Sequence, residues 1–238
     1  MVHINRFRWL LIIVISIITL GFLEYKGIIW HNSLFAVGYE VKGLDVSHHQ
    51  GHINWKVVQE EDFKFVYIKA TEGQDFIDPK FEYNWGEAKK YGFLTGAYHF
   101  FSMSSSGEEQ ALHFINKVPK QPDHLPPVID VEIHLEHDPD KVRKELRTLA
   151  LKMEQEYKKK PILYVTYDTY HAYIKGHLNE FDIWIRDIVK FPTLGSQKWA
   201  FWQYSNRGRV NGIDSYVDIN VFSGTSEQLT GYHTIDMK

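Results

Sequence analysis

The chain has 238 residues, 44% of them hydrophobic, and a formal net charge of −3. A chain of this length can bury a full core as one large domain or a small pair. Because 27 basic and 30 acidic residues are mixed without a basic block, the composition argues against nucleic acid as a partner. The sequence has no cysteine, which excludes thiol catalysis, thiolate metal sites and disulfides.

The first predicted element is an apolar segment near the amino terminus. Residues 9–23 carry no charge, and His3, Arg6 and Arg8 precede them. The length fits the apolar region of a signal peptide, but no small-x-small cleavage site follows. We expect residues 1–42 to form an uncleaved signal anchor and a stalk, with a cleaved signal and secretion as the alternative. In both cases the basic flank places the rest of the chain outside the cytoplasm, in the cell envelope or beyond it.

Strands and helices alternate along the predicted globular part, residues 43–224. Asn54 and Ser106 are the expected helix caps, and Glu109 completes a capping box with Ser106. The predicted elements in chain order are strand 43–47, helix 54–61, strand 65–69, helix 79–91, strand 95–101, helix 106–117, strand 127–132, helix 139–158, strand 162–166, helix 169–175 and strands 181–185, 199–204 and 216–221. A polar tail, residues 225–238, is expected to fray.

This alternation predicts an α/β fold with a largely parallel sheet. A closed barrel and an open doubly wound sheet both collect functional residues at the carboxyl ends of their strands, and periodicity alone does not separate the two. The loss of helices in the last third of the chain favours a barrel closed by plain strands.

Two carboxylates share one face of the predicted strand 127–132. Asp130 and Glu132 are two residues apart, so their side chains point the same way. Apolar neighbours and a like charge raise the pKa of one member of such a pair. A carboxyl group that keeps its proton near neutrality can protonate the leaving oxygen of a glycosidic bond, while its companion stabilises positive charge. The alternative is an acidic pair that caps a helix or pairs with arginine.

Other polar residues fall within or at the ends of apolar strands. Asp45 and Asp218 are acids in apolar surroundings, where a carboxylate is costly unless it is paired. Tyr98 and His99 place a hydroxyl and an imidazole near another strand end, although a lone histidine there is more often a core residue with satisfied hydrogen bonds.

Six short motifs occur in a fixed order along residues 43–222. They are GLDVS (43–47), FVYIKATEG (65–73), GAYHF (96–100), DVE (130–132), WQYS (202–205) and VDIN (217–220). Each is weak alone, but in this order and spacing the chain resembles the glycoside hydrolase family 25 lysozymes, also called Chalaropsis-type muramidases. The resemblance implies a distorted TIM-like barrel of five β/α units followed by β-strands with few helices.

The resemblance also implies an activity and a set of site residues. The implied reaction is hydrolysis of the β-1,4 bond between N-acetylmuramic acid and N-acetylglucosamine in the glycan strands of peptidoglycan, without a cofactor or metal. Glu132 matches the general acid and Asp130 its companion. The remaining candidates are the catalytic-site acids Asp45 and Asp218 and the substrate-binding residues Tyr98, His99, Tyr164, Trp184 and Gln203.

The step after protonation has two candidate routes. In one, the substrate's own 2-acetamido group attacks and Asp130 orients it; in the other, water attacks directly with inversion. We favour substrate assistance, because the acidic pair comes from one strand and lies on one side of the sugar. Arg186 departs from the small residue that many relatives carry; its guanidinium is expected to pair with an acid or contact a peptide or muramic carboxylate, with a solvated arginine as the alternative.

Three rival interpretations remain open. A chitinase-like N-acetylhexosamine hydrolase has further aspartates at two-residue spacing before its acidic pair, where this chain has Pro126 and Val128. A membrane-tethered module that binds peptidoglycan without cleaving it is the second. A metal hydrolase using His48, His49 and His99 is the third, but adjacent residues on a strand point to opposite faces and are poor joint ligands.

Overall fold

The computed structural model describes the backbone of residues 2–231 and the side chains of residues 5–231. Eight strands close into one barrel, because β1 pairs with β2 on one side and with β9 on the other. The barrel strands are β1 (Val41–Val46), β2 (Phe65–Glu72), β4 (Leu94–Phe100), β5 (Val128–Val131), β6 (Ile162–Val165), β7 (Asp182–Arg186), β8 (Phe201–Gly208) and β9 (Val217–Phe222). The predicted barrel is therefore confirmed.

Strand direction follows the distribution of helices along the chain. The pairs from β1 to β8 are parallel, whereas β9 runs antiparallel to both β8 and β1. The short strand β3 (Phe76–Ile77) forms a hairpin with the end of β2. No helix separates β7 from β8 or β8 from β9 among the described residues, in agreement with the predicted loss of helices.

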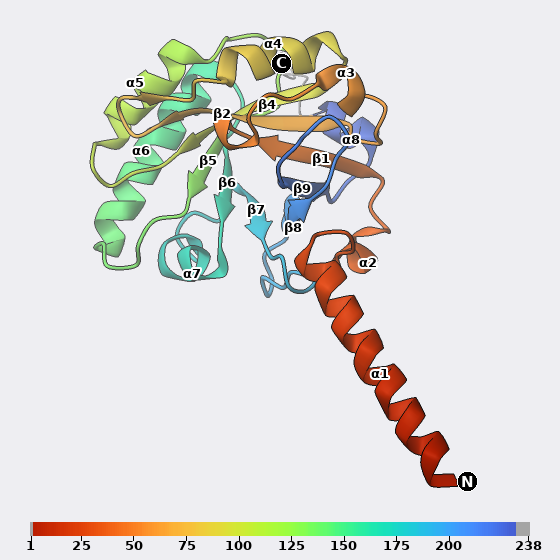
Figure 1. The fold of residues 1–238 in the computed structure, drawn as a ribbon. Helices are drawn as coiled ribbons and strands as arrows, with labels where there is room; N and C mark the ends of the chain where they lie inside the picture. The colour runs from red at the N-terminus through yellow and green to blue at the C-terminus, as the bar shows by residue number, and fades with distance from the viewer. Residues whose placement is uncertain (1, 232–238) are drawn as a thin grey trace.

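Helices cover the outside of the first part of the barrel (Figure 1). They are α3 (Trp55–Val58), α4 (Phe81–Lys90), α5 (Gly107–Lys117), α6 (Pro139–Tyr157), α7 (Tyr167–Thr169) with the π-helical turn η2 (Tyr170–Ile174), and α8 (Ser226–Gly231). The capping box of Ser106 and Glu109 at the start of α5 is confirmed. The helix predicted over 54–61 is shorter and ends at Val58; Asn54 is at its N-cap, but its side chain makes no capping bond.

Aromatic rings fill the interior of the barrel below its carboxyl end. The rings of Tyr67 and Trp184 lie 4.9 Å apart, and that of Phe201 packs on both. Two glycines make room for this packing: a Cβ on Gly43 would lie 2.4 Å from the ring of Phe65, and one on Gly96 would lie 2.2 Å from that of Tyr67. Open space inside the barrel is thereby confined to the carboxyl ends of the strands.

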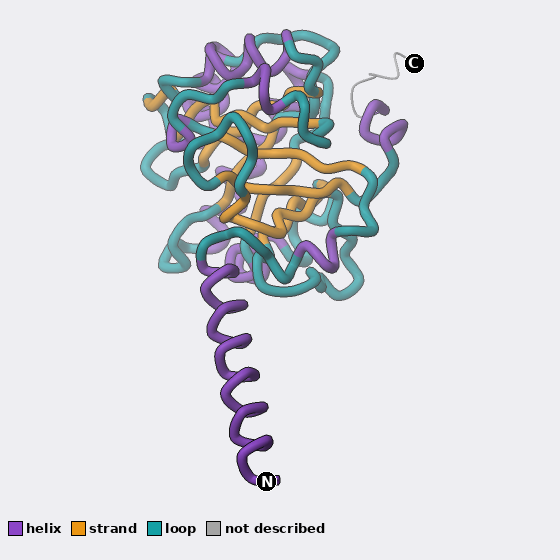
Figure 2. The backbone as a smooth tube through the Cα atoms, turned by 45° about the vertical axis from the view of Figure 1, so that its right-hand side comes forward, coloured by secondary structure: helices purple, strands orange, loops and turns teal. Residues whose placement is uncertain are grey.

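The segments on either side of the barrel differ from the predicted stalk and frayed tail. Helix α1 (Val2–Tyr25) projects away from the barrel, but residues 26–40, which include α2 (Ser33–Ala36), pack against it (Figures 1 and 2). In the tail, α8 buries Leu229, while the predicted tail beyond residue 231 lies outside the described residues. Residues Asn5–Tyr25 are long and apolar enough to cross a membrane.

Candidate active site

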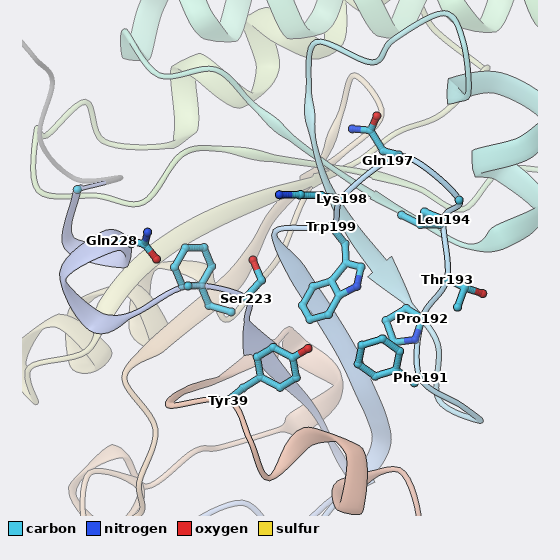
Figure 3. A pocket seen from close by; sticks show the side chains of 14 residues that line it. Tyr39, Phe191, Pro192, Thr193, Leu194, Gln197, Lys198, Trp199, Ser223 and Gln228 are labelled. Atoms are coloured by element: carbon cyan, nitrogen blue, oxygen red, sulfur yellow. The ribbon is translucent and has the colours of Figure 1, made fainter.

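A cavity of about 230 Å³ opens at the carboxyl end of the barrel. It brings together all four predicted acids and the three predicted aromatic residues. Its lining residues are Asp45, His49, Lys69, Tyr98, Phe100, Val128, Asp130, Glu132, Tyr164, Trp184 and Asp218. A larger hollow near Tyr39 and Trp199 lies on the outer wall, and none of its lining residues is acidic (Figure 3).

Asp130 and Glu132 enter the cavity from the end of β5. Asp130 is on the strand and almost fully buried, whereas Glu132 follows the last strand residue and is partly enclosed, with part of its surface open to solvent at the mouth. The Oδ1 atom of Asp130 is buried and has no hydrogen-bond partner among the described residues. Buried polar atoms are normally paired, so this oxygen is available to a donor that enters the cavity.

Asp45 and Asp218 face each other across the antiparallel pair of β1 and β9. They are direct register partners, and their carboxyl groups hydrogen-bond each other. The Nδ2 atom of Asn220 donates to Asp45 Oδ2 at 2.7 Å, and Trp184 Nε1 donates to Asn220 Oδ1 at 3.0 Å. Asn220 thus holds an acid and an aromatic wall of the cavity in place.

A second polar chain supports the same acid pair from β8, next to Asn220. Gln203 does not line the cavity, but its Nε2 donates to Asp218 Oδ1 at 2.5 Å. The hydroxyl of Tyr164 in turn donates to Gln203 Oε1. Gln203 is therefore placed to position Asp218 and Tyr164 from behind, whereas the sequence predicts direct contact with substrate.

Burial raises the pKa of all four acids. For Asp45 and Asp130 the rise is large, and it is increased by the charge of Asp218 on the first and of Glu132 on the second. Burial raises the pKa of Asp218 to about 6. The pKa of Glu132 is also raised by burial, against the opposing charge of Arg186. The four groups cannot all be ionised near neutrality, so the site holds protons that it can donate.

Two cationic side chains limit the build-up of negative charge. The Nζ atom of Lys69 is buried, donates to Glu72 Oε2 at 2.7 Å and lies 4.9 Å from the ring centroid of Phe100. Its charge lowers the pKa of Asp130. Arg186 ends β7 opposite Gln203, and its charge lowers the pKa of Glu132 and Asp218. Its charge thus acts on two acids, while a direct ion pair or a contact with a substrate carboxylate stays a prediction.

His99 is a candidate that the structure places away from the cavity and its acids. Its ring is fully buried behind β4, where Nδ1 contacts Thr71 Oγ1 at 2.8 Å and Nε2 contacts Gln110 Oε1 at 3.0 Å. Burial lowers its pKa to about 4. The reason is strand alternation: Tyr98 points into the barrel, so its neighbour points to the helix layer. His99 is therefore removed from the candidate site.

The sequence predicts no role in the site for Lys69 or Asn220, and it offers His49 only as a metal ligand. All three lie in the six motifs or directly after them, so their place in those motifs was the signal that could have identified them. His49 lines the cavity because Ser47 caps a short 3-10 turn (η1, His48–Gln50) after β1. The expectation that His48 and His49 point to opposite faces is wrong, since in this turn their rings lie 4.0 Å apart.

The geometry gives no support to a metal site in the part of the chain that is described. His48 Nδ1 is 2.7 Å from Asp78 Oδ2, which also accepts from the His48 backbone N–H. His99 is engaged elsewhere, with Gln110. Within residues 2–231 no group of three or more histidine, aspartate or glutamate side chains has an arrangement that could hold a metal ion.

Comparisons with known proteins point to a single family. The profile of the family described as Glycosyl hydrolases family 25 matches residues 44–213. The chain is 38% identical to the Escherichia coli protein YegX over 82% of this chain and 74% of that protein. It is 34% identical to Lysozyme M1 of Streptomyces globisporus, over 79% and 70% of the two chains. A family 25 glycosyl hydrolase structure from Bacillus anthracis superposes with a TM-score of 0.79, at 45% identity, covering 82% of this chain and 94% of that one.

Proposed function

Since the chain belongs to glycosyl hydrolases family 25, we propose that it hydrolyses the β-1,4 bond between N-acetylmuramic acid and N-acetylglucosamine in peptidoglycan. The names of its lysozyme relatives support this substrate. The cavity at the barrel mouth supports it independently, because it combines acids that hold protons with aromatic rings on which sugars can pack.

Glu132 is the general acid of the proposed reaction. It lies at the exposed mouth of the cavity, where a glycan strand has access, and burial raises its pKa. Its proton passes to the glycosidic oxygen, which leaves with the N-acetylglucosamine unit. After departure of that unit, the ionised Glu132 accepts a proton from the water that completes hydrolysis.

The free oxygen of Asp130 is the observation that carries the proposed mechanism. Its Oδ1 atom is buried and lacks a hydrogen-bond partner among the described residues, in the same cavity as Glu132. It is available to accept the N–H of the substrate's 2-acetamido group. The acetamido carbonyl oxygen then attacks C1 of N-acetylmuramic acid, and the positive charge that develops on the acetamido group is stabilised by Asp130.

The acids on β1 and β9 hold the sugar in this proposal. Asp45 and Asp218 are fixed by Asn220 and Gln203, so their remaining hydrogen-bonding capacity is directed into the cavity. The rings of Tyr98, Tyr164 and Trp184 form the wall against which the sugar packs.

The deciding experiment compares the wild-type chain with Glu132→Gln on peptidoglycan in a zymogram. Glutamine keeps the size of the side chain but cannot donate a carboxyl proton, so we expect a loss of at least about 10²-fold. Equal clearing by both chains would refute the assignment, and no clearing by the wild type would favour a module that only binds peptidoglycan. Release of reducing sugar from chitin but not from cell wall would favour a chitinase-like enzyme.

The proposed location is the outer side of a membrane. Residues Asn5–Tyr25 are long enough to span it, and Arg6 and Arg8 lie on the side expected to stay in the cytoplasm. The catalytic barrel then lies in the cell envelope, where peptidoglycan is found. A chain that is processed after the apolar segment would instead be secreted.

A further inference from the structure

The segment that follows α1 is fixed to one edge of the catalytic mouth. Trp30 Nε1 donates to the backbone oxygen of Tyr204, on β8, at 2.6 Å. Asn32 is fully buried, and its Nδ2 donates to the backbone oxygen of Asp187, directly after β7, at 2.8 Å. Each acceptor directly follows one of the register partners Arg186 and Gln203, so the segment is fixed to the end of β7 and to β8 beside the site.

The end of α1 itself is held by the last residues of β8 and by Arg209, which follows the strand. Arg207 Nη1 donates to the backbone oxygen of Tyr25 at 2.6 Å, and Arg209 Nε donates to that of Lys26 at 2.7 Å. These carbonyls lie at the carboxyl end of the helix, where a positive charge is favourable. Figure 1 shows the consequence: β5, β6 and β7 point toward the end of the barrel from which α1 leaves.

The same segment turns back alongside the last turns of α1. A hollow of about 650 Å³ is lined on one side by Ile17 and Leu20 of α1 and on the other by Ile29 and Leu34. At about 1.5 Å per residue, Ile17 and Leu20 lie about 8–12 Å below the end of a helix whose length matches a hydrocarbon core of ~30 Å. Ile29 and Leu34, across the hollow from them, lie at a similar depth below the end of the helix.

The outer surface of this region has the composition of a membrane interface. We define the docking surface as residues 28–37 together with Val189 and Lys190. Its exposed apolar side chains are Ile28, Ile29, Leu34, Phe35, Val37 and Val189. Lys190 belongs to it and the exposed Lys26 and Arg209 lie beside it. Apolar side chains next to cations suit a bilayer with anionic headgroups.

We propose that the docking surface binds the outer leaflet of the membrane that α1 crosses, and that the catalytic mouth therefore opens beside the lipid surface. The proposal rests on the proposed membrane anchor and defines the substrate as glycan lying next to the bilayer. Tyr204 follows Gln203, which holds Asp218, and Asp187 follows Arg186. The membrane-bound edge therefore lies one residue away from two side chains that act on the acids of the site.

The absence of cysteine from the chain allows a direct test by single-site spin labelling. The full chain carrying Leu34→Cys or Val189→Cys is reconstituted in nanodiscs of phosphatidylethanolamine and phosphatidylglycerol. Both positions are exposed, at 77% and 67%, so labelling leaves the core intact. The matched control is Leu151→Cys, exposed at 53% on α6, which lies across the barrel from α1 in Figure 1.

Collision rates with oxygen and with a water-soluble nickel chelate report the depth of each label. We expect the oxygen-to-nickel ratio at positions 34 and 189 to exceed that at position 151 several-fold. If the label at position 189 is as accessible to nickel as the control label, the proposal is overturned. This holds even when the label at position 34 is immersed in the bilayer, because the barrel then does not contact the lipid. The readout does not depend on hydrolysis, so an inactive chain would refute the muramidase assignment without affecting this test.

Discussion

Asp45 on β1 and Asp218 on β9 form a hydrogen-bonded carboxyl pair across the antiparallel seam that closes the barrel. Burial raises the pKa of both acids, and the charge of Asp218 raises that of Asp45 further, so the pair retains a proton near neutrality. A proton retained on this pair reduces the negative charge next to Asp130 and Glu132. The seam therefore contributes to the electrostatics of the site as well as to its shape.

The pair makes stability depend on pH. Burial raises the pKa of Asp218 to about 6, so its stabilising contribution is complete below the unfolded-state pKa near 4 and is lost as the pH rises through about 6. Two pKa units correspond to about 3 kcal/mol. Between about pH 4 and pH 7, the free energy of unfolding of the wild type should therefore fall by about 3 kcal/mol more than that of Asp218→Asn.

Denaturant unfolding at the two pH values measures this difference. The matched control is Asp168→Asn, an exposed position at the start of α7, whose pH profile should follow the wild type. Parallel profiles for the wild type and Asp218→Asn would contradict the raised pKa.

Replacement of Asp130 by asparagine separates catalysis from stability. Asparagine preserves the shape but lacks the negative charge that stabilises the developing cation, so kcat should fall by at least about 10²-fold. Because burial and the charge of Glu132 raise the pKa of Asp130, its ionised form weakens the fold at neutral pH, and the variant should be at least as stable as the wild type. Initial rates and thermal midpoints measure the two effects. A variant with nearly full kcat would refute the role of Asp130.

Lys69 should control the acidic limb of the pH–rate profile. Its charge lowers the pKa of Asp130, so Lys69→Met should raise that pKa and move the acidic limb to higher pH. Methionine keeps the apolar length of the buried side chain. The exposed Lys160→Met serves as the control and should leave the profile in place. An unchanged acidic limb in Lys69→Met would show that ionisation of Asp130 does not limit the rate.

Arg186 should control the basic limb of the pH–rate profile. Its charge lowers the pKa of Glu132, and the proposed reaction requires Glu132 to be protonated. Arg186→Gln should therefore raise the pKa of Glu132 and shift the basic limb of kcat/KM to higher pH. Profiles recorded side by side with Lys69→Met should show shifts in different limbs. A shift of the acidic limb alone in Arg186→Gln would contradict the assignment of Glu132 as the acid.

Local signals predict most of the fold. Alternating strands and helices, the capping box at Ser106 and the thinning of helices after residue 175 all survive in the structure. The family indicated by the six motifs is confirmed as well. These features depend on neighbours in sequence, or on motifs that place each acid at a strand end.

The contacts that set the site depend on distant residues and are not apparent from such patterns. Asn220 reaches Asp45 from the opposite end of the chain, and residues 26–40 pack on β8 through backbone carbonyls that any sequence would offer. His99 is a different case, since the inward position of Tyr98 already implies that its neighbour faces outward. Strand alternation thus excludes His99 from the site, although its place in one of the six motifs favours it.

The identity of the new reducing end after digestion of purified peptidoglycan decides whether the chain is a muramidase. Products are reduced with borohydride and analysed by mass spectrometry. We expect reduced N-acetylmuramic acid at every new end with the wild-type chain, and no such product above background with Glu132→Gln. New ends that carry reduced N-acetylglucosamine would contradict this expectation.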